Sequence, residues 1–299
     1  MQSIKRDTSY TVKSVYLKYK KRYKNIKEVR SFHFKNVSES HNIKYKSESS
    51  NDQSCYMDAY FNTDSNYNPI VVLIHGGGWK SGDKNMMQPL AQYIASKGYT
   101  CFAVNYRLSG EALYPKGIYD IKEAIRFIKD NASKYHANDS KVAVLGCSSG
   151  AQMASLIGVT NNNPKFESYS KNATSSSVQA VINIDGVLAF KHPESKEGTV
   201  ASLWLGGTYE EKPEVWKEAS ALTHVDKNSP PILFINSQHE RFHAGRDDMI
   251  KILNQYDIYN QVITLSDSPH SFWLFYPWFN DTVKHITTFL DNTLKKSNP

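Results

Sequence analysis

The chain has 299 residues, a formal net charge of +7, 40% hydrophobic and 12% aromatic residues, a composition typical of globular proteins. No apolar run approaches the roughly 20 residues of a membrane-spanning helix, and the N-terminal Met-Gln-Ser-Ile-Lys-Arg shows no apolar signal-peptide core. Three cysteines are too few for a disulfide framework, and no Cys/His spacing resembles a zinc site. We therefore expect no membrane span, no metal and no cofactor.

The positive charge is concentrated at the start of the chain. Residues 1–46 hold 13 Lys and Arg against three Asp and Glu, while the remainder holds 23 against 26. A basic patch can bind nucleic acid, but no nucleic-acid-binding motif accompanies this one. We interpret residues 1–40 as a basic, solvated N-terminal segment with one helix near 10–23, and expect no nucleic-acid partner. An acidic polysaccharide stays open as a partner.

Apolar runs of strand length follow along the chain after two weaker strand signals near 42–47 and 54–61. Runs without alternation suit strands covered on both faces, as in a parallel sheet. The six runs are residues 70–74, 100–104, 142–145, 181–184, 232–235 and 262–265. Helical patterns separate them, at residues 86–97, 118–135, 149–159, 246–256 and 278–295.

This alternation predicts an α/β fold with one mostly parallel sheet flanked by helices. Residues 187–228 interrupt the alternation, and we expect a small helical cap insertion there, over the carboxyl edge of the sheet where such folds bind ligands. No linker divides the rest, so we expect residues 41–299 to form a single catalytic domain.

The strongest chemical signal is Gly146-Cys147-Ser148-Ser149-Gly150, between the run 142–145 and the helical pattern 149–159. A serine at a sharp strand-to-helix turn exposes its hydroxyl above the sheet, near a helix N-terminus that favours developing negative charge. Small residues two positions away let strand and helix approach closely. We predict Ser148 as a nucleophile.

A glycine-rich segment, His75-Gly76-Gly77-Gly78-Trp79, directly follows the run 70–74. Its backbone N–H groups can point into a cavity, so we predict Gly77, Gly78 and Ser149 as donors of an oxyanion hole. A plain turn or a phosphate loop is the alternative, but neither a Walker nor a dinucleotide motif is present.

The partners of Ser148 should follow it in the chain. His270 comes after the last apolar run and is predicted as the general base. Glu240, five residues past the run 232–235, is predicted as the acid that orients it. Asp247 and Asp248 compete for this role, but they fall in a helical pattern where solvated charges are common.

These motifs resemble the α/β-hydrolase superfamily, in particular the hormone-sensitive-lipase-like and α/β-hydrolase-3 esterases. Further matches are Asn105-Tyr106-Arg107-Leu108, Leu205-Gly206-Gly207-Thr208 and Ser229-Pro230-Pro231. The resemblance implies the α/β-hydrolase fold and a serine esterase that works through an acyl-enzyme. One departure is Asn236-Ser237-Gln238-His239-Glu240, where the family has His-Gly-Asp, so that a Glu would replace the usual Asp.

The C-terminal segments His270–Phe279 and Glu240–Arg246 look like bacterial polysaccharide-degrading esterases. That likeness implies an acetylated saccharide as the ester substrate, and a periplasmic or secreted protein. Trp79 and Phe272, next to the catalytic motifs, are the predicted substrate-binding aromatic residues, although core packing is the common role of such side chains.

Three alternatives stay open: a carboxylesterase or lipase on small or lipophilic esters, a serine peptidase or amidase, and a non-catalytic binding module of the same fold. The sequence leaves the acyl chain length and the oligomeric state open.

Overall fold

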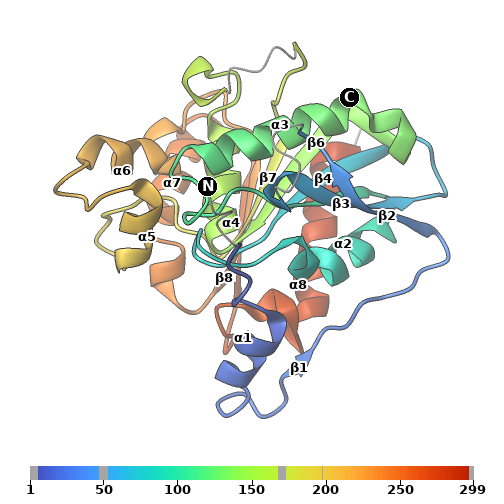
Figure 1. Ribbon diagram of the computed structural model, residues 1–299, viewed down its shortest axis with the longest axis horizontal. Helices are drawn as coiled ribbons and strands as arrows, with labels where there is room; N and C mark the ends of the chain where they lie inside the picture. Colours follow the sequence, from blue (N-terminus) through green and yellow to red (C-terminus); the bar gives the residue numbers. More distant parts are fainter. Residues whose placement is uncertain (1–5, 47–52, 168–172, 197, 296–299) are drawn as a thin grey trace.

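The computed structural model describes residues 6–46, 53–167, 173–196 and 198–295. An eight-stranded sheet runs through the centre of the molecule, in the order β2-β3-β5-β4-β6-β7-β8-β9 (Figure 1). Its strands are β2 (Val37–Lys44), β3 (Tyr56–Asn62), β4 (Asn68–Ile74), β5 (Thr100–Val104), β6 (Ala137–Cys147), β7 (Ala180–Ile184), β8 (Ile232–Ser237) and β9 (Asn260–Leu265). All six predicted apolar runs are strands of this sheet.

Strands β5, β4, β6, β7, β8 and β9 are parallel, as predicted, while β2 and β3 add an antiparallel edge. In β4 every residue is buried. Alternate residues of this strand face opposite sides: Ile70, Val72 and Ile74 enter one core cluster, Val71 and Leu73 the other. The absence of polar alternation in the sequence therefore reflects two covered faces.

Helices cover both faces of the sheet (Figure 1). The helices on one face contribute to the same core cluster as Ile70, and they are α3 (Lys116–Asp130), α4 (Ser149–Val159) and α7 (Arg246–Gln255). Those on the other are α1 (Val12–Tyr19), α2 (Gln88–Ala95) and α8 (Trp278–Leu290). None of the helices in the described ranges has the length and apolar character to cross a membrane.

Between β7 and β8, where the sequence predicts a cap, the chain forms α5 (Gly198–Leu205), α6 (Pro213–Ala219) and the 3-10 turn Ala221–His224. Helices α5 and α6 lie together at one end of the molecule (Figure 1). Trp204 of α5 is fully buried and stacks on Trp79 at 5.0 Å between ring centroids, so this segment packs against the loop that follows β4.

The N-terminal segment is more closely packed than the charge pattern suggests. Val15, Tyr23, Ile26 and Val29 are buried in the core cluster of the α2 and α8 face. The short strand β1 (Lys27–Glu28) pairs with β10 (Phe275–Tyr276) in a separate two-stranded sheet. From residue 6 to residue 40, every lysine of this segment is exposed, in agreement with a solvated basic surface.

Candidate active site

Ser148 lies at the turn between β6 and α4, as predicted. Its backbone has φ 55° and ψ −122°, a strained conformation for a residue other than glycine. Two glycines make the turn possible: a Cβ on Gly146 would lie 2.0 Å from the carbonyl oxygen of Gly150, and one on Gly150 would lie 2.3 Å from that of Ile74. This close approach directs the Ser148 side chain to the carboxyl edge of the sheet.

His270 reaches Ser148 from the loop after β9. Its Nε2 lies 2.8 Å from Ser148 Oγ, within hydrogen-bond distance. The ring of Phe242 stacks on the imidazole, with 3.4 Å between ring centroids. The structure thus brings together the serine and the histidine that chain order pairs, at a distance that would allow proton transfer between them.

The carboxylate that contacts His270 belongs to Asp185 and not to Glu240, which corrects the sequence prediction. Asp185 Oδ2 lies 2.7 Å from His270 Nδ1, and Asp185 is only 1% exposed. Glu240 is exposed in a short 3-10 turn (Glu240–Phe242), and no hydrogen bond joins its carboxylate to His270. The carboxylate that contacts His270 thus follows β7, the neighbour of β6 in the sheet, rather than β8.

Strand β8 does not provide the carboxylate that contacts His270. Its last residue, Ser237, instead donates hydrogen bonds to the Asp185 carboxylate. The backbone N–H of Ser237 donates to Asp185 Oδ1 at 2.9 Å, and its hydroxyl donates to Oδ2 at 2.6 Å. These two hydrogen bonds fix the orientation of the Asp185 carboxylate. The sequence carried a signal for Asp185, since it directly follows the apolar run 181–184, just as Ser148 follows its own strand and turn.

Asp247 and Asp248, the two competitors, lie on α7 and pair elsewhere. Asp247 accepts from Arg246 at 2.7 Å, and Asp248 accepts from Lys251 at 2.8 Å. Both side chains are substantially exposed. They are the solvated helix charges that their sequence pattern indicates.

The glycine loop, residues 75–82, packs directly on the turn that holds Ser148. A Cβ on Gly76 would lie 3.0 Å from Ser148 Cβ. Gly77 and Gly78 have positive φ angles, +124° and +62°, a conformation that glycine adopts without strain. Ser149 is the first residue of α4, where the N–H has no acceptor within the helix.

A pocket of about 210 Å³ opens beside Ser148. Gly78 and Ser149 line it, so two of the three predicted oxyanion donors border the same cavity as the serine hydroxyl. Gly77 is not among the lining residues. The walls of the pocket are completed by Trp79, Asp185, Val187, Lys196, Val200, Arg241 and Phe242.

The two predicted substrate-binding aromatic residues differ in position. Trp79 lines the pocket, and its indole N–H donates to Gln152 at 3.0 Å, which holds the ring in place. Phe272 is fully buried in the core beside Trp273 and does not line the pocket. Phe242, which sequence reasoning missed, stands in the pocket wall instead and carries the guanidinium of Arg241 over its outer face, 4.2 Å from the ring centroid.

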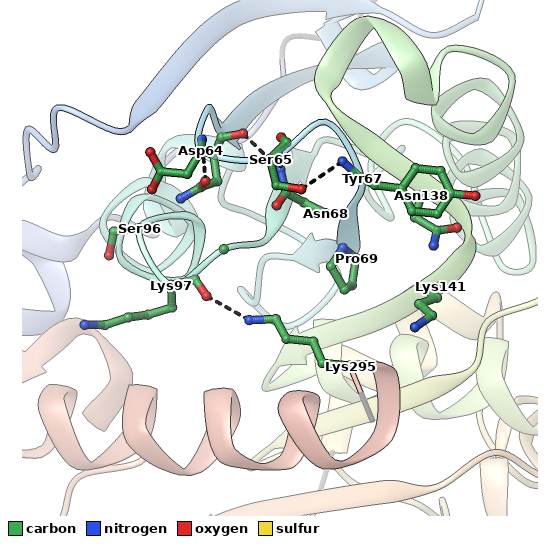
Figure 2. Close-up of a pocket in the computed structure, with 12 residues that line it drawn as sticks. Asp64, Ser65, Tyr67, Asn68, Pro69, Ser96, Lys97, Asn138, Lys141 and Lys295 are labelled. Atoms are coloured by element: carbon green, nitrogen blue, oxygen red, sulfur yellow. Dashed lines mark hydrogen bonds between the residues drawn. The ribbon is translucent and has the colours of Figure 1, made fainter. Parts of the chain in front are cut away.

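A larger cavity, about 630 Å³, lies at the opposite end of the strands (Figure 2). It is lined by the first residues of β4, by Asn138 and Lys141 of β6, and by lysines that include Lys97 and Lys295. The Ser148, Asp185 and His270 side chains are absent from it. Across the described stretches of chain, no cluster of three or more His, Cys, Asp or Glu is arranged to hold a metal ion.

This fold, with a serine at a strand-to-helix turn and a histidine after the last strand, is the α/β-hydrolase fold. Residues 57–250 match the BD-FAE family, an α/β-hydrolase esterase family, and the chain belongs to it. The resemblance stated from the motifs is thereby confirmed at the level of the superfamily.

Individual relatives agree with this assignment. Esterase LipC of Mycobacterium tuberculosis is 27% identical over 190 residues, which are 62% of this chain and 45% of the relative. The chain thus spans about half the length of the curated relatives it matches.

Solved structures share the fold. A truncated carbohydrate esterase from gut microbiota superposes with a TM-score of 0.79 at 23% identity, over 89% of this chain and all of the other. Esterase B from Lactobacillus rhamnosis superposes with a TM-score of 0.73 at 20% identity, over 95% and 94% of the two chains.

Proposed function

We propose that this chain is a serine esterase that hydrolyses short acyl esters, acetyl esters of carbohydrates foremost, through an acyl-enzyme on Ser148. The observation that carries the proposal is the continuous hydrogen-bonded path from Ser148 Oγ through His270 to Asp185. The family membership supports ester hydrolysis as the reaction.

In the first step His270 Nε2 takes the Ser148 proton while Oγ attacks the ester carbonyl carbon. Asp185 accepts from Nδ1–H, which keeps the imidazole in the tautomer whose Nε2 lone pair faces the serine, and it then stabilises the imidazolium. N–H groups of the glycine loop and of Ser149 hold the oxyanion.

Collapse of the tetrahedral intermediate expels the alcohol, which takes the proton from His270. Water then attacks the acyl-Ser148 ester with His270 again acting as the base, and the carboxylic acid leaves.

The size of the pocket supports a short acyl group. Pockets for drug-sized ligands have volumes of about 300–1,000 Å³, and the cavity at Ser148 is about 210 Å³. Val187, Val200 and the Trp79 ring supply apolar walls, while Lys196 and Arg241 are exposed cations in its lining. A polar, sugar-bearing alcohol on the open side is compatible with that lining, and the carbohydrate-esterase fold relative favours it.

Replacing Ser148 tests the reaction. We expect Ser148→Ala to lower kcat for p-nitrophenyl acetate by about 10⁴-fold or more, because nucleophile and base act as one unit. Labelling of the wild type, but not the variant, by a fluorophosphonate probe is the second readout. Full activity of the variant would remove Ser148 from the mechanism.

A substrate panel tests the specificity. We expect acetate release from acetylated xylan or pectin, and kcat/KM falling from acetyl to octanoyl p-nitrophenyl esters. Preference for long acyl chains would instead indicate a lipase, and cleavage of aminoacyl p-nitroanilides an amidase.

A further inference from the structure

The N-terminal strap, residues 6–10, lies against the glycine loop. The N–H of Gly82 donates to the carbonyl oxygen of Asp7 at 3.2 Å, and the Ser81 hydroxyl donates to the Asp7 carboxylate at 3.0 Å. The N–H of Tyr10 donates to Ser81 Oγ at 2.8 Å. These bonds join the start of the chain to the loop that carries the candidate oxyanion donors.

Arg6 is the part of the strap that reaches deepest. Its side chain is 7% exposed and ion-paired with Glu111 at 3.0 Å. Nη2 donates to the carbonyl oxygen of Gly82 at 3.1 Å and lies 3.3 Å from Nε2 of His75. One guanidinium thus contacts both ends of the glycine loop.

The contact with Arg6 determines where His75 carries its proton. A guanidinium has donors only, so Nε2 of His75 must accept and the ring proton must sit on Nδ1. Nδ1 lies 2.8 Å from the carbonyl oxygen of Gly76 and therefore donates to it. Burial, and secondarily the positive charge of Arg6, lower the pKa of His75 to about 3, so the ring stays neutral at physiological pH.

The hydrogen bond from His75 Nδ1 to the Gly76 carbonyl also orients the peptide group between Gly76 and Gly77. In a trans peptide the C=O of one residue and the N–H of the next point in opposite directions. Holding the Gly76 carbonyl towards His75 therefore also sets the direction of the Gly77 N–H. Because Gly76 packs on Ser148, this peptide lies at the nucleophile.

We propose that Arg6 is a positioning residue for the oxyanion hole: it selects the Nδ1–H form of His75, and His75 in turn orients the Gly76–Gly77 peptide. The inference rests on the proposed function, because an oxyanion hole matters only if Ser148 is the nucleophile. Without Arg6 the ring is free to carry its proton on Nε2. Nδ1 then faces the Gly76 carbonyl as a second acceptor and the peptide is no longer held.

The kinetic test compares Arg6→Ala with wild type in the full chain, using p-nitrophenyl acetate. A misoriented donor weakens binding of the transition state rather than the substrate, so we expect kcat to fall about 10- to 100-fold with KM within about twofold. Ethylguanidinium in the millimolar range should restore part of kcat, and ethylammonium at the same concentration should not. Lys20→Ala, an exposed position in the same segment, is the matched control and should retain wild-type kcat.

A second readout is independent of turnover. In ¹⁵N-histidine NMR spectra the His75 signal, assigned by its loss in His75→Gln, should show the Nδ1–H tautomer in wild type and a changed tautomer mixture in Arg6→Ala. An Nε2–H tautomer in wild type, or an unchanged kcat in Arg6→Ala, overturns the inference.

Two further comparisons distinguish a folding defect from a loss of positioning, and a failure of this inference from a failure of the proposed function. If Arg6→Ala does not fold, Arg6→Met keeps the length of the side chain but has no N–H donor for His75, and a lowered kcat at unchanged KM supports the inference while wild-type kcat contradicts it. Absence of hydrolysis by the wild type would refute the proposed function, whereas hydrolysis that is insensitive to Arg6 would refute only this inference.

Discussion

Asp185 and Ser148 occupy matching places on neighbouring strands. Cys147 of β6 pairs with Ile184 of β7, so the residue after each strand lies at the same edge, and the Ser148 N–H donates to the Ile184 carbonyl at 2.8 Å. The next strand in the sheet places Ser237 against the same carboxylate. Parallel strands in register thus bring three side chains together that are far apart in the sequence.

At the residue scale, the hydrogen bond between Asp185 and His270 can be tested by comparing a variant of Asp185 with a variant of Glu240. We expect Asp185→Asn to lower kcat by about 10³- to 10⁴-fold, because an amide can donate to Nδ1 and stabilise the unproductive tautomer. Glu240→Gln should stay within about twofold of wild type, since that carboxylate is exposed and makes no hydrogen bond with His270. Steady-state kinetics on p-nitrophenyl acetate measure kcat of both variants. A larger loss of kcat in Glu240→Gln than in Asp185→Asn would instead assign the role of the acid to Glu240.

At the scale of elements, the β6–α4 turn depends on the absence of side chains where strand and helix meet. Ser148 adopts its strained φ because the surrounding backbone is held on both sides, by β6 and by the first turn of α4. Backbone atoms, which cannot move aside as a flexible side chain can, surround Gly146 and Gly150. The two glycines of the motif Gly146–Gly150 are therefore required by the packing of strand and helix.

We expect Gly146→Ala to destabilise the protein by at least about 2 kcal/mol, because its Cβ would overlap the Gly150 carbonyl. Differential scanning fluorimetry should show Tm lower by about 5 °C or more. Gly110→Ala is the matched control: a Cβ there meets nothing within 4 Å, and we expect a change within about 0.5 kcal/mol. Equal Tm values for the two variants would contradict the packing argument.

At the scale of the whole molecule, residues 6–30 belong to the folded unit. Strand β1 pairs with β10 directly after the His270 loop, the Tyr10 hydroxyl shares a hydrogen bond with Ser271 at 3.0 Å, and Arg6 reaches the glycine loop. The strap therefore contacts both loops that flank Ser148. In the rest of this segment, residues 11–30, the lysines face solvent while Val15, Tyr23, Ile26 and Val29 enter the core.

Truncating one of these apolar side chains measures how much the packing of the N-terminal segment contributes to the free energy of unfolding. Ile26 is 5% exposed, and Ile26→Ala should lower the free energy of unfolding by about 2–4 kcal/mol. Leu17, 48% exposed in the same segment, is the control, and Leu17→Ala should change it by less than about 0.5 kcal/mol. Urea unfolding of both variants provides the comparison, and an unaffected Ile26→Ala would mean that the segment is not part of the cooperative unit.

Much of this architecture was predictable because its causes are local. Continuous apolar runs mark strands covered on both faces, and they identified all six parallel strands of the sheet. The glycines around Ser148 and in residues 76–78 mark turns that need close approach or positive φ, and both turns lie where the motifs predict them. His270 was predicted as the base by chain order alone, and the structure places it next to Ser148.

Other features were decided only by tertiary structure. The choice of Asp185 over Glu240 depends on which strand ends beside β6, and the burial of Phe272 and exposure of Phe242 to the pocket depend on how the last loops fold back. The contact between Arg6 and His75 joins residues whose neighbourhood no local pattern encodes. The sequence by itself thus determined the strands, the turns and the position of Ser148 between β6 and α4, because periodicity and steric demand are properties of short segments. Strand order and long-range packing decided which carboxylate contacts His270, which side chains line the pocket and where the strap lies, because those contacts exist only once distant segments meet.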